Sequence, residues 1–142
     1  CGYQTQANFS GMLYSSWYSV HQSNILKEQY RLENDINYDY VIRARFDINY
    51  SHIVDCKQYD NKIIHTSNRS DMPTEMIDDR FAFGSNALMN IYCNGFFMLD
   101  YIHSLRFAKD EIFCGETLLY EMGKLYGITY KKIDSLHCGH IR

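Results

Sequence analysis

The sequence contains no long apolar segment, no Cys-x-x-Cys pair and no surplus of positive charge. No run of about 18 apolar residues is present and no charged-then-apolar leader opens the chain, so neither a membrane span nor a signal peptide is expected. The net charge is -3, whereas dedicated nucleic-acid binders usually carry an excess of clustered Lys and Arg. We therefore expect no nucleic-acid partner and no membrane span.

Disulfide and zinc frameworks are also disfavoured. The five cysteines lie at positions 1, 56, 93, 114 and 138, an odd number with wide spacing. Reduced thiols in a reducing compartment fit this pattern best. The expected location is the cytoplasm.

The composition suits one domain over residues 1–142. A chain of 142 residues with 46% hydrophobic content can bury one core, but it is too short for two comfortable ones. The 13 Tyr and 8 Phe are numerous, and most tyrosines are expected at core edges with a solvated hydroxyl. The chain begins at Cys1 rather than at methionine, and we expect it to be a processed or excised piece of a longer protein.

Hydrophobic spacing alternates between helix and strand along the first half. Apolar and aromatic residues at positions 14, 17, 18, 21, 25 and 32 predict an amphipathic helix over about 10–34. Residues 38–48 follow as a strand with positions 40, 42, 44 and 46 on one face, while Arg43 and Arg45 share the other. Segment 49–73 is polar and predicts a loop-rich insertion, in which a short strand at 62–66 pairs with another near Ile53.

The second half continues this alternation. A short apolar strand precedes Ser85, which is predicted to cap a helix whose apolar stripe runs from Leu88 to His103. A further helix is predicted to begin near Gly115, to carry residues 118, 119, 122 and 125 inward, and to stop at Gly127. Residues 128–133 predict a last strand. Helices that feed strands in this order indicate an α/β fold.

The most informative motif is Arg43-Ala44-Arg45-Phe46-Asp47, at the end of the first predicted strand. In open α/β sheets ligands collect beyond the carboxyl ends of strands, so Asp47 is expected to hold a divalent cation while Arg43 and Arg45 face phosphate. The alternative is an edge strand with a solvated polar face, which explains the alternation without a ligand. Arg43 also has a structural explanation, as the ion-pair partner of Asp39 or a neighbouring acid.

Two further features are candidates for chemistry. Glu116 lies in the first turn of the helix predicted from Gly115, where the helix dipole favours a carboxylate, so capping electrostatics explains it as well as catalysis does. His137 and His140 form a His-x-x-His pair after the last strand. Such a pair can ligate a metal, although zinc sites usually recruit further close Cys or His ligands.

Several of these segments occur together in a recognisable order. The Arg-x-Arg-x-Asp strand end is the most specific of them, and the Glu-Thr-Leu-Leu helix start at Glu116 adds weight. Together they resemble a family of small glycosyltransferase-like proteins found in large DNA viruses and in bacterial surface-polysaccharide loci. The resemblance covers about residues 9–133, and the segments that carry it are 14–16, 22–24, 38–47, 79–85 and 115–119.

The resemblance implies an A-type glycosyltransferase fold, which is a three-layer α/β sandwich, together with a nucleotide-sugar donor, a glycan or protein hydroxyl acceptor, and a Mn²⁺ or Mg²⁺ ion. Asp47 would take the place of the family's metal-anchoring aspartate, and His137 or His140 that of a late metal ligand. The family usually has Asp-x-Asp at this point, whereas position 45 is arginine here. That arginine could itself neutralise the leaving diphosphate.

The resemblance also implies catalytic roles. Glu116 is expected to be the base that takes the proton of the acceptor hydroxyl, with Asp79 as second choice. Asp78, Arg43 and Arg45 are expected to bind substrate. A-type domains usually need a preceding β-α-β unit for the nucleoside base, and no complete one precedes Phe9, so we expect an N-terminally trimmed domain. A viral source would place it in the host cytoplasm.

Two other functional classes stay open from the residues. A non-catalytic carbohydrate- or protein-binding module on the same scaffold would keep the tyrosines and not use the acids. A metal-dependent phosphoester hydrolase would use Asp47, Asp79 and the two histidines around one or two ions.

Overall fold

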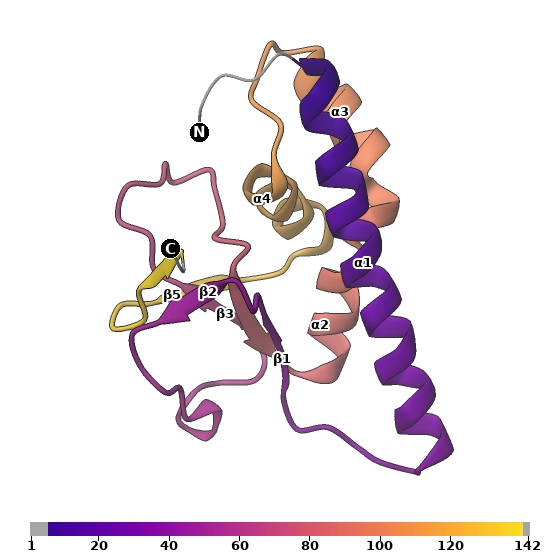
Figure 1. The fold of residues 1–142 in the computed structure, drawn as a ribbon, viewed down its shortest axis with the longest axis vertical. Coiled ribbons are helices and arrows are strands. Elements are labelled where there is room, and N and C mark those ends of the chain that lie inside the picture. Colours follow the sequence, from indigo (N-terminus) through magenta and orange to yellow (C-terminus); the bar gives the residue numbers. More distant parts are fainter. Residues whose placement is uncertain (1–5, 141–142) are drawn as a thin grey trace.

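A four-stranded mixed sheet forms the centre of the chain, and helices pack on it (Figure 1). The computed structural model describes residues 6–140, and the side chains of residues 11–138. The helices are α1 (Gln6–Glu33), α2 (Asn86–Cys93), α3 (Leu99–Phe107) and α4 (Gly115–Tyr126), with short 3₁₀ turns at Cys56–Gln58 and Asn94–Met98. The strands are β1 (Val41–Ala44), β2 (Ile48–Tyr50), β3 (Ile64–Ser67), β4 (Phe81–Gly84), β5 (Tyr130–Ile133) and β6 (Cys138–His140).

The strand order is β1-β4-β3-β5, and only β4 is reversed within this sheet. Because β4 is antiparallel to both β1 and β3, and β5 is parallel to β3, the carboxyl ends of β1, β3 and β5 lie at the edge where β4 begins. β2 and β6 form a separate antiparallel ribbon. The residues that follow β1 and the residues that precede β4 therefore lie side by side at one end of the strands.

The two faces of the sheet are covered differently. On one face, side chains such as Ile64 and Ala82 pack against the helices, in a core that includes Trp17, Tyr92 and Leu118. The other face carries Phe81, Phe83 and Ile133, which pack against Leu136 and residues of segment 50–59. The predicted α/β class is confirmed. In the described residues helices cover one face, so the three-layer A-type arrangement stays a prediction.

Trp17 fixes the position of α1. Its side chain is 2% exposed, and its ring centroid lies 5.7 Å from that of Tyr92. A Cβ built on Gly95 would lie 2.9 Å from Trp17 Cζ3, so the indole fits only because position 95 has no side chain. The same position interrupts the helix predicted through His103, since α2 ends at Cys93 and a 3₁₀ turn leads into α3.

Several predicted elements are confirmed. Ser85 caps α2 by accepting a hydrogen bond from the Leu88 N–H, and Gly127 ends α4 with φ of 65°. β5 lies within the predicted segment 128–133. These positions carry strong local signals, because a serine N-cap and a left-handed glycine each satisfy free backbone groups.

Other predictions were wrong in extent or in pairing. β1 ends at Ala44 and a turn separates it from β2, so 38–48 is not one strand. The strand predicted at 62–66 is β3, which pairs with β4 and β5 in the sheet rather than with residues near the fully exposed Ile53. The polar residues on both sides of β3 led to the prediction of a surface hairpin, although the strand itself is buried.

The predicted apolar stripe of α1 is also only partly buried. Trp17 is in the core, but Tyr18, Ile25 and Leu32 are 50%, 36% and 68% exposed. Leu125 on α4 was expected inward as well and is 47% exposed. Within residues 6–140, no helix combines the length and the apolar content needed to cross a bilayer.

The fit of Trp17 against Gly95 predicts that Gly95→Ala destabilises the fold by about 1–3 kcal/mol, because the added methyl overlaps the indole and Met122 Sδ, at 3.1 Å. Urea denaturation of both proteins measures this difference. Gly11→Ala is the matched control. Gly11 lies on the same helix as Trp17, and a Cβ added there meets no atom within 4 Å. That change is expected to stabilise by about 0.5–1 kcal/mol, and equal effects of the two changes would contradict the packing argument.

Candidate functional site

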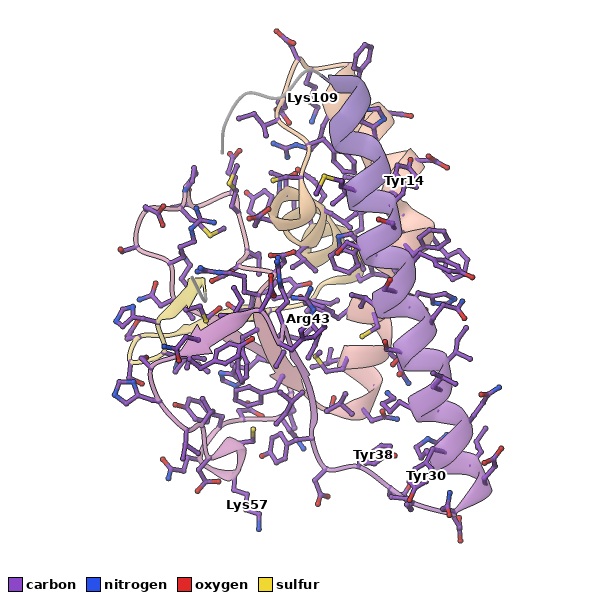
Figure 2. The ribbon with its side chains drawn as sticks, in the orientation of Figure 1. Tyr14, Tyr30, Tyr38, Arg43, Lys57 and Lys109 are labelled. Atoms are coloured by element: carbon purple, nitrogen blue, oxygen red, sulfur yellow. The ribbon has the colours of Figure 1, made fainter. Side chains whose placement is uncertain are left out.

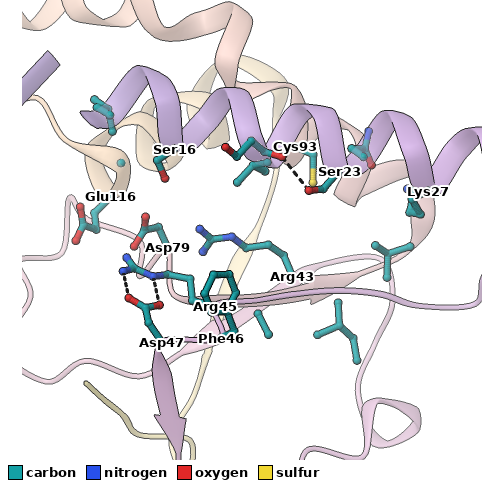
Figure 3. Close-up of a pocket in the computed structure, with 18 of the residues that line it drawn as sticks. Ser16, Ser23, Lys27, Arg43, Arg45, Phe46, Asp47, Asp79, Cys93 and Glu116 are labelled. Atoms are coloured by element: carbon teal, nitrogen blue, oxygen red, sulfur yellow. Dashed lines mark hydrogen bonds and ion pairs between the residues drawn. The ribbon is translucent and has the colours of Figure 1, made fainter. Parts of the chain in front are cut away.

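A groove of about 990 Å³ lies between α1 and β1. One wall is a face of α1, and the other is β1 with the turn after it, while the starts of β4 and α4 close one end (Figure 3). The residues that line it are Met12, Leu13, Ser16, Ser19, Val20, Ser23, Asn24, Lys27, Val41, Ile42, Arg43, Ala44, Arg45, Phe46, Asp47, Asp79, Cys93, Cys114, Gly115 and Glu116.

The groove brings together five residues that the sequence predicted for the site: Arg43, Arg45, Asp47, Asp79 and Glu116. They come from the end of β1, the segment before β4 and the first turn of α4. Figure 3 shows the carboxylates of Asp79 and Glu116 toward one end of the groove and Lys27 at the other end, with Arg43 between them. Arg45 and Asp47 also lie at the carboxylate end in Figure 3, so charges of both signs meet there.

Arg43 points from β1 to the helix side of the sheet. It is paired across strands with Ala82, which belongs to the helix-side core, and residues paired in this way project to the same face. Figure 2 shows its side chain between the sheet and α1, whereas Lys57 and Lys109 extend at the margins of the molecule. The predicted edge strand with a solvated polar face is therefore half right, because β1 is an edge strand but Arg43 is half-buried.

The guanidinium of Arg43 has no ion-paired or hydrogen-bonded partner in the part of the chain that the structure describes, although its positive charge acts on Asp79 across the groove. Its Nη1 is buried without a hydrogen-bond partner, and no carboxylate reaches ion-pair distance, Asp39 included. A partly buried, unpaired cation is costly, by about 1–3 kcal/mol or more for the unsatisfied donor alone. Such a group is expected where a ligand brings the missing acceptor.

Asp79 precedes β4 and faces the start of α4. Its Oδ2 would lie 3.0 Å from a Cβ placed on Gly115, so the absence of a side chain at position 115 makes room for this carboxylate. Burial raises the pKa of Asp79, the charges of Glu116 and Asp78 raise it further, and Arg43 and Arg45 oppose the shift without cancelling it. Asp79 is thus a stronger proton acceptor than an exposed aspartate.

Glu116 lies beside Asp79 in the first turn of α4, as the sequence predicted. Its side chain is 17% exposed, and its Oε1 lies 3.6 Å from Arg69 Nη1. The partial positive charge of the helix start also favours a carboxylate here. Two carboxylates therefore share one end of the groove, and the charge of Glu116 raises the pKa of Asp79.

Arg45 and Asp47 bind each other rather than an open site. The guanidinium donates from Nε to Oδ1 at 2.9 Å and from Nη2 to Oδ2 at 2.6 Å. Tyr50 fixes the backbone of this turn, because its hydroxyl accepts from the Arg45 N–H at 2.8 Å and donates to the Arg45 carbonyl at 2.7 Å. Phe46, predicted on an apolar face, is instead 99% exposed at the rim of the groove.

The structure places Asp47 in the groove but not His137, and the metal site stays a prediction. Both carboxylate oxygens of Asp47 accept from Arg45, and His137 lies outside the groove. The side chain of His140 lies outside the described residues, although its backbone pairs with Ile48. Among the residues described, no three His, Cys, Asp or Glu side chains come together as a metal-binding group.

Asp78 is not brought into the groove. It is 1% exposed and accepts hydrogen bonds from Arg80, the shortest at 2.8 Å from Nε and 2.7 Å from Nη2, and one from Ser67 Oγ at 2.7 Å. Arg80 also donates to the Cys138 carbonyl at 2.8 Å, which joins β4 to β6. The predicted substrate-binding aspartate therefore holds the sheet and the β2–β6 ribbon together.

The polar face of α1 was given no role from the sequence, although segments 14–16 and 22–24 contributed to the resemblance. Ser16, Ser19, Ser23 and Lys27 recur at helical spacing along the wall of the groove. This helical repeat of polar residues was the sequence signal for a polar helix face. The apolar residues between them made the repeat hard to recognise. Lys27 is fully engaged within the protein, with Asn86, Asn90 and Glu28.

Comparison with protein-family models, with curated proteins and with solved structures gives no match to this chain. A functional conclusion therefore depends on the residues and geometry of the groove.

The Asp78–Arg80 pair predicts acid sensitivity. Burial raises the pKa of Asp78, but hydrogen bonds from Arg80 and Ser67 outweigh it, so the folded-state pKa lies below the usual 3.8. The pair therefore stabilises the fold above about pH 4, and this stability is lost as the pH falls through the lowered folded-state pKa. Asp78→Asn is expected to cost about 3 kcal/mol at pH 7, because Arg80 stays buried without its charge partner.

Urea denaturation from pH 7 to pH 3 measures this effect, and the gap between wild type and Asp78→Asn should narrow as the pH falls. Asp71→Asn is the control, since Asp71 pairs with Arg69 at the surface. A gap that stays constant across this range would refute the assignment.

Proposed function

We propose that the groove between α1 and β1 binds a nucleotide-diphosphate sugar and that the protein transfers the sugar to a hydroxyl acceptor. The observation that carries this proposal is the unpaired guanidinium of Arg43, which lines the same groove as the carboxylates of Asp79 and Glu116. A phosphate-binding cation next to a pair of proton acceptors is the minimum that this reaction needs. The family resemblance of the sequence supports the same class of reaction.

Arg43 holds the diphosphate in this proposal. A guanidinium binds phosphate oxygens with directed, charge-assisted hydrogen bonds, and it stabilises the negative charge that grows on the leaving group. Arg45 is less suited, because Asp47 already accepts from its Nε and Nη2. Arg43 therefore fills the electrostatic role that the resemblance gives to a metal ion.

Asp79 and Glu116 serve the acceptor. The acceptor oxygen attacks the anomeric carbon of the sugar, the bond from that carbon to the diphosphate oxygen breaks, and the acceptor hydroxyl gives its proton to a carboxylate. Asp79 is the base in this proposal, because burial raises its pKa and the charge of Glu116 raises it further. Glu116 lies at the start of α4, where it can hold the acceptor hydroxyl.

Arg43→Met tests the diphosphate site. Calorimetric titration with nucleoside diphosphates is expected to show affinity about 10–100-fold weaker than wild type, since charge-assisted hydrogen bonds to phosphate are lost. Arg45→Met is the matched control with the same charge change, and its effect on binding should be smaller.

A nucleoside diphosphate that bound wild type and Arg43→Met equally would remove Arg43 from the site, and a wild type that binds none would reject the proposal. Binding without sugar transfer to any hydroxyl acceptor would favour the non-catalytic module.

The carboxylate pair predicts a pH dependence. Transfer requires ionised Asp79, so the rate is expected to fall at low pH as this group protonates, and Asp79→Asn should lower the rate by about 10²–10⁴-fold. Glu116→Gln removes a charge that raises the pKa of Asp79, so the acid limb of the rate profile should move to lower pH.

Arg43→Met removes the opposing charge and should move the same limb to higher pH. The profile of donor turnover against pH for these variants measures both shifts. An acid limb that stays in place in both would exclude Asp79 as the base.

A further inference from the structure

The amide of Asn24 is buried in the wall of the groove without a partner. The residue is 8% exposed on a helix whose neighbouring side chains are largely exposed, and its Oδ1 makes no hydrogen bond. No described residue bonds its amino group either, and the two ends of an amide can exchange places by rotation, so either can face the groove. The side chain therefore offers both an acceptor and a donor.

The fold gains nothing from an amide at this position. Asparagine is a weak helix former, and a buried polar group without a partner opposes folding. The polar neighbours differ in this respect, because Ser23 Oγ donates to the Ser19 carbonyl at 2.9 Å and Lys27 is bound on α2 and by Glu28. Asn24 thus combines low helix propensity with an unsatisfied buried amide, in the same groove as the unpaired Arg43. A position that is unfavourable for folding in both respects indicates a ligand contact.

The place of Asn24 along α1 identifies the part of the ligand that it meets. Trp17 marks the carboxylate end, since its Nε1 lies 3.3 Å from a Cβ placed on Gly115. Asn24 follows seven residues later, which is about 10 Å along the helix axis. With the transferred sugar at Asp79 and the diphosphate at Arg43, the group that extends toward Asn24 is the nucleoside.

We infer that Asn24 is a specificity-determining residue that hydrogen-bonds the nucleoside of the donor, through a ribose hydroxyl or the donor and acceptor groups on the edge of the base. This inference rests on the proposed function and adds the residue that recognises the nucleoside part of the donor. Side-chain amides pair with the adjacent donor and acceptor groups of a base edge, and sites built in this way reject ligands that lack the matching groups.

The test separates the nucleoside from the phosphates. Calorimetric titrations with UDP, GDP, ADP and CDP, and with inorganic pyrophosphate, are made on wild type and on Asn24→Leu. The variant should bind the preferred nucleoside diphosphate about tenfold more weakly, because a ligand polar group loses its partner, while pyrophosphate affinity stays unchanged. Gln29→Leu, on the same helix and outside the groove, is the control.

Stability gives a second readout. Asn24→Leu should unfold at the same urea concentration as wild type or higher, because an unpaired amide is replaced by an apolar side chain of similar size. If this variant does not fold, Asn24→Ala is compared in the same titrations.

Equal weakening for pyrophosphate and nucleoside diphosphates, or no change for either, would overturn the inference and leave the Arg43 site standing. A wild type that binds neither pyrophosphate nor any nucleoside diphosphate would overturn both proposals. Weaker binding of 2′-deoxy-UDP than of UDP in wild type, absent in Asn24→Leu, would support the inference and assign the contact to the ribose.

Discussion

The packing of Trp17 against Gly95 and Tyr92 is the contact on which the site depends. It holds one half of α1 on the helix-side core, and from this point the helix runs along β1 as the wall of the groove. An indole buried against a glycine leaves little freedom to shift, because interiors are close-packed and an added methyl already collides. The separation of α1 from the sheet is thus set by core packing, and Asn24 and Arg43 keep unpartnered polar atoms in the groove beside it.

Strong local signals made much of the fold predictable. Ser85, Gly127 and the apolar spacing of α4 satisfy free backbone groups or bury one face, so their positions follow from neighbouring residues alone. The break at Gly95 and the central place of β3 depend on contacts distant in sequence, with Trp17 and with β4 and β5. Spacing along the chain carries no information on those contacts.

The site was predictable to a similar degree. Residue type and position at element ends brought Arg43, Asp79 and Glu116 forward, because charged groups at the ends of buried strands and helices need a reason to be there. Pairing could not be read in the same way. Asp47 is bound by Arg45 and Asp78 by Arg80, and only the fold shows that these aspartates are committed while Arg43 is not. Asn24 was missed because burial of one side of α1 is invisible in a weakly amphipathic sequence.

The single reversed strand of the sheet has a consequence for how a ligand enters. Because β4 runs against β1, Ala44 lies opposite Phe81, and the basic end of one strand stands beside the acidic start of the other. The groove therefore contains a fixed electric field, directed from the guanidinium toward the carboxylates. A dipolar ligand placed head to tail in the wrong sense would meet repulsion at both ends, so polarity alone selects one of its two orientations before any specific contact forms.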